Sequence, residues 1–282
     1  MSYFTIILHI QRSGGSSLDK ILQKQFNSTF LSRQLKRFTR GKDLTKQEYW
    51  RKIKMSERYY SSHICYGIHE FLPQPYKYVA FVRDPLQRII SLYKYSLQNK
   101  DSFYHNVAVG KTFEEFVLKS ELHELDNGQT RVIAGGDYPN FFINRTPYGK
   151  CDEGLLQIAL GNIEKDFLMV GVTELYYESI VLLSKLNNWE LEEFANLNSS
   201  AGINLEISDA LKDQIRKANW LDYKLFEICR EKLLNNFKNN EKLANEVKEF
   251  KLKNELFNKK MSSTYTTIDK LKRGANAFLK KI

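Results

Sequence analysis

The sequence contains little cysteine, and this limits the kinds of site it can carry. Three cysteines occur in 282 residues, Cys65, Cys151 and Cys229, and they lie far apart. No Cys-x-x-Cys pair exists, which argues against a zinc site, and no metal is expected. The odd number and wide spacing also argue against a disulfide framework and favour a reducing compartment.

Long apolar runs are also absent. No stretch approaches the roughly 20 apolar residues that a membrane-spanning helix needs. The first residues lack the basic segment and cleavage site of a signal peptide. We therefore expect a cytoplasmic protein. Residues 248–282 carry ten Lys/Arg against three Asp/Glu, which leaves three roles open for this tail: peripheral contact with the inner membrane, oligomerisation, or a frayed end.

The composition is that of a folded protein with a basic surface. Hydrophobic residues make up 42% and aromatic residues 13% of the chain, and the net charge is +10. Such a surplus favours anionic partners such as nucleotides, acidic glycans, nucleic acid or anionic membranes. A soluble protein with a merely lysine-rich surface has the same composition, so charge alone does not choose between them.

Buried strands alternate with helices along the chain. Apolar, β-branched runs predict strands at 3–10, 76–82 and 167–174, each buried on both faces. Helical periodicity covers 17–26, the segment after Pro85, 112–120, 152–164, 175–187 and 208–260. Residues 31–60 are polar and basic, and we expect surface helix and loop there.

This alternation predicts an α/β fold, a three-layer sandwich with a central parallel sheet and a helical C-terminal region. We expect one domain over residues 1–240 and a basic helical extension over 241–282. Ligands of such sheets bind at the carboxyl ends of the strands. All three predicted strands end in polar motifs, so one crevice is expected to collect them.

The first strand runs into "HIQRSGGSSL", residues 9–18, which has the features of a phosphate-binding turn. Gly14 and Gly15 permit a tight turn and close approach of the backbone to an anion. The following helix start favours phosphate oxygens, and Arg12 adds a fixed positive charge. The Gly-Lys-Ser/Thr ending of an ATP-binding loop is missing. An ordinary strand-to-helix turn stays open as an alternative.

The second strand ends in "RDPLQRIIS". Arg83 follows the strand, and Ser91 lies about two helical turns later. Both side chains are expected to reach one phosphate, because arginine offers a bidentate fork. The alternative is a purely structural strand end, in which Arg88 pairs with Asp84.

Together these motifs resemble those of sulfotransferases that act on carbohydrates. "ILHIQRSGGSSLDKIL" is similar to their 5′-phosphosulfate loop, and "VAFVRDPLQRIISLYKY" to their 3′-phosphate motif. "GIHEFLPQPYKYVAFVRDP" resembles the heparan sulfate 2-O/6-O type, and "NGQTRVIAG" and "FLMVGVTELYYESIVLL" resemble later landmarks. The resemblance covers residues 3–235 and implies a P-loop-kinase-like fold. It also implies 3′-phosphoadenosine 5′-phosphosulfate (PAPS) as donor and PAP as product.

The resemblance also implies a role for individual residues. Arg83 and Ser91 would bind the 3′-phosphate. Arg12 stands where the family has lysine at the bridging oxygen of the donor, and it keeps the charge in a bulkier, differently aimed group. The 5′-phosphosulfate would be bound by the turn itself, through Ser13, Gly14, Gly15, Ser16 and Ser17.

An acceptor hydroxyl is a poor nucleophile and needs a general base, which the resemblance places on a histidine. His69 in "GIHEF" matches the position of the base in the 6-O branch and is the first candidate. His63 is the second, and Glu70 is a residue that could orient or replace the histidine. His9, at the end of the first strand, is expected to be structural.

The acceptor is expected to be a hydroxyl-bearing glycan, and a lipid-linked sugar, a small metabolite and a tyrosyl peptide stay open after it, in that order. Gln129 and Arg131 match a family stretch near donor and acceptor, although a helix cap or loop bridge is equally consistent. Arg37, in the basic segment "SRQLKRFTRGK", is a candidate for guiding an anionic glycan, or lies on a solvated charged face. Two other functions stay open: a P-loop small-molecule kinase, and a non-catalytic protein that binds nucleic acid or membrane.

Overall fold

A four-stranded parallel sheet forms the centre of the protein. The computed structural model describes residues 3–26, 59–71, 75–136, 144–195 and 203–279. Within them the strands are β1 (Phe4–Leu8), β2 (Tyr59–Ser62), β3 (Tyr76–Val82) and β4 (Phe167–Val172), in the order β2-β1-β3-β4. β1 pairs in parallel with both β2 and β3, and β3 with β4. All five residues of β1 are buried, as a strand covered on both faces must be.

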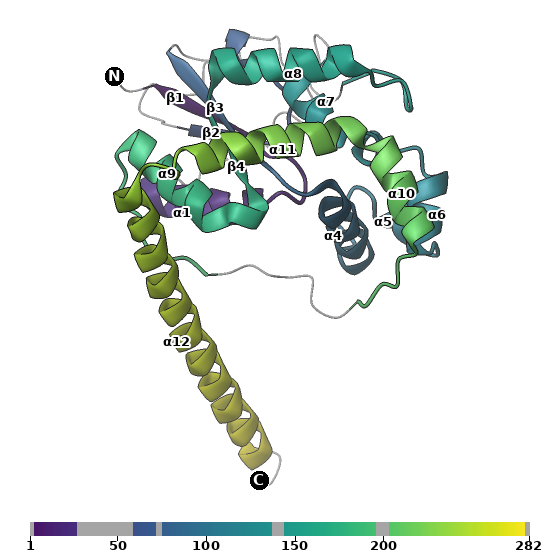
Figure 1. Cartoon of the computed structure of the whole chain (residues 1–282). Helices are drawn as coiled ribbons and strands as arrows, with labels where there is room; N and C mark the ends of the chain where they lie inside the picture. Colours follow the sequence, from purple (N-terminus) through teal and green to yellow (C-terminus); the bar gives the residue numbers. More distant parts are fainter. Residues whose placement is uncertain (1–2, 27–58, 72–74, 137–143, 196–202, 280–282) are drawn as a thin grey trace.

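Helices cover both faces of this sheet. In Figure 1, α7 (Gly128–Ala134) and α8 (Glu153–Asp166) lie above the strands, and α1 (Gly15–Phe26) and α9 (Tyr176–Asn187) lie below them. α11 (Trp220–Asn235) crosses in front. The predicted three-layer α/β class is therefore confirmed. The remaining helices are α4 (Pro85–Gln98), α5 (His105–Ala108), α6 (Phe113–Lys119), α10 (Asp209–Ala218) and α12 (Glu241–Leu279). Short 3₁₀ turns, η1, η2 and η3, span Ile68–Phe71, His123–Leu125 and Thr173–Leu175.

The strand prediction at 76–82 is confirmed at both ends. The other two strands are shorter than predicted, because β1 ends at Leu8 and β4 at Val172. β2 was not predicted as a distinct strand, since "YYSS" is too short and polar to show alternation. The expectation for residues 31–60 lies almost entirely outside the described residues.

Helix starts follow from local chemistry. Asp84 accepts a hydrogen bond from the Gln87 N–H, and Pro85 occupies the first turn of α4, where no backbone donor is needed. Ser208 caps α10 through the Leu211 N–H. α4 therefore begins two residues after Arg83, with Asp84 as its N-cap, and this fixes where the second motif meets the sheet.

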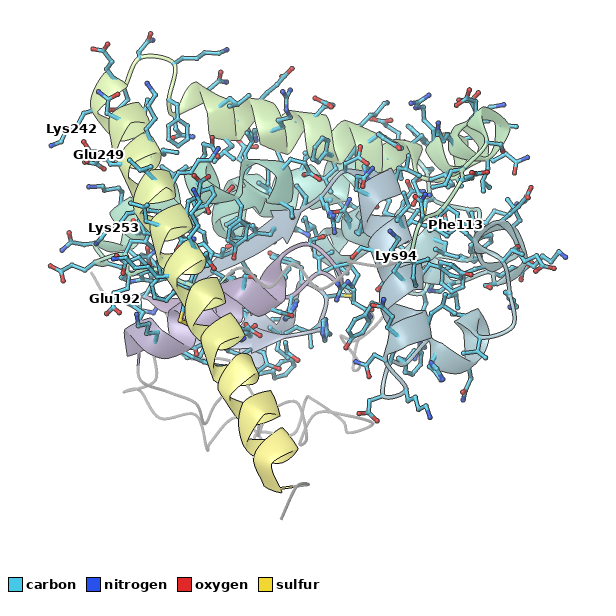
Figure 2. The ribbon with its side chains drawn as sticks, turned by 90° about the horizontal axis from the view of Figure 1, so that it is seen from below. Lys94, Phe113, Glu192, Lys242, Glu249 and Lys253 are labelled. Atoms are coloured by element: carbon cyan, nitrogen blue, oxygen red, sulfur yellow. The ribbon has the colours of Figure 1, made fainter. Side chains whose placement is uncertain are left out.

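The predicted extension begins as a separate helix that packs on the domain. Leu243, Val247 and Phe250 of α12 join the main core, and α12 projects away from it toward the C-terminus (Figures 1 and 2). Lys253, labelled in Figure 2, pairs with Glu193 at 3.0 Å. The division at residue 240 stays a prediction. None of the described helices is long and apolar enough to cross a membrane.

We predict that Asn254→Ala detaches α12. Asn254 is fully buried; its Oδ1 accepts from the Phe194 N–H at 2.8 Å and its Nδ2 donates to the Tyr177 hydroxyl at 3.2 Å. Leaving that N–H unpaired costs roughly 1–3 kcal/mol. Urea unfolding should show this loss, while Leu252→Ala at an exposed position of the same helix stays within about 0.5 kcal/mol. Equal stability of the two variants would contradict the docking.

Candidate functional site

The carboxyl ends of the strands bring together the motifs that the sequence singled out. β1 is followed by the turn 9–14, β2 by His63, β3 by Arg83 and β4 by Thr173. Since all four strands run parallel, these segments share one edge of the sheet. The site is built from that edge.

The glycine turn has the backbone that the sequence predicts. Gly14 has φ +82, in the left-handed region, and α1 begins at Gly15. A Cβ at Gly15 would lie 2.2 Å from Cδ2 of the buried His9 ring, so no larger residue fits there. The ring of Tyr176 closes the turn from beneath, 3.1 Å from where a Gly14 Cβ would stand. α1 therefore starts at a turn that His9 and Tyr176 pack closely, and a helix N-terminus of this kind favours an anion.

Arg83 connects the two motifs. Its Nη1 donates to the Arg12 carbonyl at 3.1 Å, and its Nε lies 3.8 Å from Oε1 of Glu174. That Nε has no hydrogen-bond partner among the described residues. Burial lowers the pKa of Arg83 and raises that of Glu174. A partly buried arginine with an unused donor is suited to binding an oxyanion.

The Arg12 side chain lies on α4 rather than over the turn. Its Nε donates to Ser91 Oγ at 3.0 Å, and its guanidinium stacks 4.4 Å from the centre of the Tyr95 ring. Burial lowers the pKa of Arg12, and the nearby positive charge of Arg83 adds to this. Arg12 thus joins the two predicted 3′-phosphate residues, with its backbone carbonyl bonded to Arg83 and its side chain to Ser91. Tyr95 is a part of this site that sequence reasoning missed; it follows Ser91 by one turn.

His63 lies at the same edge as the turn. It directly follows β2, is exposed, and its Nδ1 is 2.7 Å from the His9 carbonyl oxygen. The two histidine rings are 4.3 Å apart. A carbonyl only accepts, so Nδ1 carries the proton and the basic lone pair is on Nε2.

His69, the first candidate for the base, lies elsewhere. Its ring packs 4.6 Å from Tyr76, the first residue of β3, and its Nδ1 is 2.9 Å from the Tyr78 hydroxyl. The same cluster contains Asp166, directly before β4. β3 has seven residues, so its two ends are about 20 Å apart. Burial lowers the pKa of His69, yet the ring is at the amino edge of the sheet, opposite the turn. Glu70 is the next residue of the same 3₁₀ turn and shares this placement, so the structure corrects the expectation for both.

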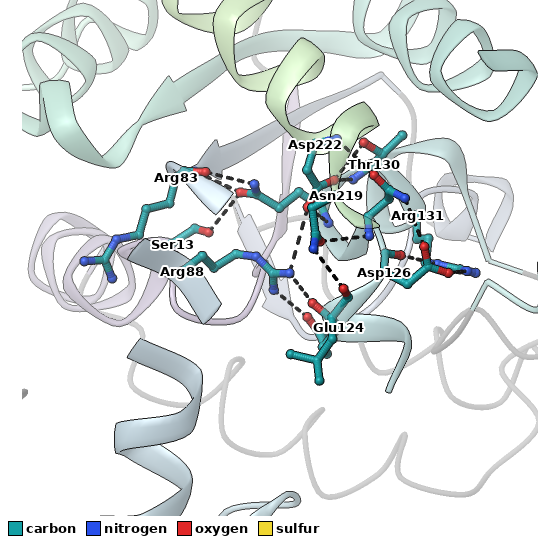
Figure 3. A network of polar contacts seen from close by, with 12 residues as sticks. Ser13, Arg83, Arg88, Glu124, Asp126, Thr130, Arg131, Asn219 and Asp222 are labelled. Atoms are coloured by element: carbon teal, nitrogen blue, oxygen red, sulfur yellow. Dashed lines mark hydrogen bonds and ion pairs between the residues drawn. The ribbon is translucent and has the colours of Figure 1, made fainter. Parts of the chain in front are cut away.

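Two of the predicted acceptor residues are buried within polar networks (Figure 3). Arg131 forms an ion pair with Asp126 and donates to the carbonyls of Thr146 and Pro147, which makes it a support for the 144–149 segment. Gln129 bonds the backbone of Arg83. Neither side chain is placed to touch an acceptor, and Arg37 lies outside the described residues.

The proposed pairing of Arg88 with Asp84 is wrong. Arg88 is fully buried and pairs with Glu124 at 2.6 Å, with Asp222 at 3.9 Å on its other side. Asp222 lies 134 positions along the chain, on α11, so no local pattern could have indicated it. Among the described residues, no group of three or more His, Cys, Asp or Glu side chains is arranged to hold a metal.

A comparison with models of protein families identifies the family of this chain. The model of the galactose-3-O-sulfotransferase family matches residues 60–267, most of the chain. The chain belongs to this family. The match agrees with the predicted carbohydrate sulfotransferase and with its fold, but it does not confirm the heparan sulfate type. The matched region starts after the glycine turn, so the interpretation of residues 9–18 as a phosphate-binding turn rests on their own geometry.

Two individual proteins resemble this member of the family. Galactose-3-O-sulfotransferase 2 of Homo sapiens is 23% identical over 163 residues, which is 57% of this chain and 40% of the relative. The chain thus matches less than half the length of that relative. A crystallised sulfotransferase from Alicyclobacillus acidocaldarius is 12% identical, with a TM-score of 0.45 over 80% of this chain and 94% of the other. A TM-score this low supports no conclusion about the fold or the function of this chain.

We predict that Gly15→Ala destabilises the protein through its clash with His9. Inserting a methyl group into a packed site costs roughly 1–3 kcal/mol. Gly161→Ala, in a helix with nothing within 4 Å of the new Cβ, is the control and should be neutral or slightly stabilising. Thermal unfolding of both variants measures the difference. If they unfold at the same temperature, His9 does not pack against the turn.

Proposed function

We propose that the protein transfers the sulfuryl group of PAPS to a hydroxyl of a carbohydrate, with a galactose unit as the first acceptor to test. Membership of the galactose-3-O-sulfotransferase family supports this acceptor class over the heparan type suggested by the "GIHEF" resemblance. The observation that carries the proposal is that Arg12, beside the glycine turn, bonds both Arg83, through its backbone carbonyl, and Ser91, through its side chain. No ATP-type Gly-Lys-Ser/Thr follows the glycines, which counts against a kinase.

The donor fits this edge at its two charged ends. The 5′-phosphosulfate would lie at the N-terminus of α1, over residues 13–17, because the N–H groups and dipole of a helix start favour an anion. The 3′-phosphate would be held by Arg83 and Ser91, with the Arg12 guanidinium beside them. Two guanidinium groups there supply the positive charge that a dianionic phosphate requires.

The proposed function requires a second position of the Arg12 side chain, next to the donor. In the described structure it is held by Ser91 and Tyr95. In the family that the sequence resembles, the residue at this place contacts the bridging oxygen of the donor. Negative charge develops on this oxygen as the sulfur–oxygen bond breaks. We propose that Arg12 serves this oxygen when the donor is bound.

His63 is the general base in this proposal. Its Nδ1–H is directed to the His9 carbonyl, so Nε2 is the atom that takes the proton of the acceptor hydroxyl. The acceptor oxygen forms a bond to sulfur while the bond from sulfur to the bridging oxygen breaks, and the electron pair stays on the 5′-phosphate. In-line positioning and charge stabilisation carry such a transfer, as they do phosphoryl transfer.

We predict that Arg83→Ala weakens binding of adenosine 3′,5′-bisphosphate about 10- to 100-fold, the worth of one or two charge-assisted hydrogen bonds. Isothermal calorimetry measures this. Arg230→Ala removes the same charge from an exposed position on α11, where the side chain pairs with Glu227 in its own helix, and is the matched control. Equal losses in the two variants would reduce the effect to net charge and reject the 3′-phosphate assignment.

We predict that His63→Ala lowers kcat for sulfuryl transfer by about 10²-fold or more, with bisphosphate affinity unchanged, because a base acts on the acceptor and not on the nucleotide. His69→Ala should keep kcat within a few-fold. A radiolabelled donor and galactose-terminated oligosaccharides provide the assay. A normal kcat in His63→Ala, together with a collapse in His69→Ala that stays folded, would return the role to His69.

A further inference from the structure

One fully buried side-chain amide connects both halves of the proposed nucleotide site. Gln129, in the first turn of α7, is 0% exposed. Its Oε1 accepts from the Arg83 N–H at 2.8 Å, and its Nε2 donates to the Arg83 carbonyl at 2.9 Å. The same Oε1 accepts from Ser13 Oγ, in the glycine turn, at 3.4 Å.

The two hydrogen bonds between Gln129 and Arg83 take the place of strand pairing, which ends one residue earlier at Val82. β3 stops at Val82, so Arg83 stands one residue beyond the last paired position. A buried backbone N–H and C=O need partners, and an amide supplies one acceptor and one donor in a single group. This fixes the backbone of Arg83 and, through it, the direction in which the guanidinium leaves the strand end.

Gln129 is itself held from behind by α11. Its N–H donates to Asp222 Oδ2 at 3.1 Å, and the Thr130 N–H and Oγ1 donate to Asp222 Oδ1 at 2.7 and 2.8 Å. Figure 3 shows these contacts running from Arg83 and Ser13 to Asp222. Three hydrogen-bonding groups therefore depend on one fully buried carboxylate.

The charge of Asp222 is balanced within the same network. Arg88 Nη2 lies 3.9 Å from Asp222 Oδ2 while its Nη1 bonds Glu124 at 2.6 Å. Gly128 leaves room for this arginine, since a Cβ there would lie 2.8 Å from Arg88 Nη2. Fully buried side chains joined by several hydrogen bonds are held rigidly, and a rigid member is what a positioning role requires.

We propose that Gln129 is a positioning residue that sets Arg83 relative to the glycine turn and thereby gives the site its selectivity for a nucleotide with a 3′-phosphate. This rests on the proposed sulfotransferase function. Arg83 is held by two short bonds and Ser13 by one longer bond, so removing the amide disturbs the 3′ end of the site more than the 5′ end. Selectivity, not overall affinity, is therefore the property that Gln129 controls.

The test compares two probes, adenosine 3′,5′-bisphosphate and adenosine 5′-phosphate, by calorimetry on the full chain. Gln129→Met keeps the side-chain length but removes the donor and the acceptor; Gln129→Glu keeps the acceptor and loses the donor, and serves if the first fails to fold. We expect bisphosphate affinity to fall about tenfold or more, and 5′-phosphate affinity to change less than about threefold. Thr130→Val removes a bond to the same Asp222 without contacting Arg83 or Ser13, and should preserve the ratio of the two affinities.

A double variant separates positioning from an independent contribution. If Gln129 acts through Arg83, then Gln129→Met combined with Arg83→Ala binds bisphosphate no more weakly than Arg83→Ala alone. Additive losses, an unchanged ratio in both Gln129 variants, or an equal change in Thr130→Val would each overturn the inference while leaving the proposed function standing. If the wild-type protein binds neither probe, the proposed function fails, and the role of Gln129 fails with it.

Discussion

The contact between Arg83 and the backbone of Arg12 is the interaction on which the site depends. It joins the end of β3 to the turn after β1, two neighbouring strands of a parallel sheet. Parallel pairing is what allows it, because the polar residues after each strand then meet at one edge. Among the described residues, the Nε of this guanidinium has no hydrogen-bond partner, and the Arg12 side chain reaches Ser91 on α4. In the proposed function, the positive charges of Arg83 and Arg12 would face the negatively charged phosphates of the nucleotide.

Local chemistry made much of this predictable from the sequence. The strand 76–82, the proline-started helix after it and the glycine turn all appear where their residues indicate, since each is fixed by neighbours within a few positions. The order of the motifs identified the family at the level of carbohydrate sulfotransferases. The heparan sulfate 2-O/6-O type predicted within that class is not confirmed, and the "GIHEF" segment that suggested it lies away from the site edge.

The features that could not be predicted from the sequence depend on contacts between residues far apart in the chain. His63 and His69 are six residues apart, yet they lie at opposite edges because β2 ends at Ser62 and the chain then turns back to start β3. Arg88 finds its partners on η2 and α11, and Gln129 finds Arg83 46 positions away. Gln129 was a candidate for binding substrate, but it is fully buried and bonds the backbone of Arg83, so it supports the site from within.

A crystal structure with adenosine 3′,5′-bisphosphate tests the central claim most directly. The account predicts the 5′-phosphate within hydrogen-bond distance of the backbone N–H groups at the start of α1, and the 3′-phosphate within the same distance of the Arg83 guanidinium and Ser91 Oγ. A nucleotide bound with its 3′-phosphate away from Arg83, or bound at another edge of the sheet, would contradict it.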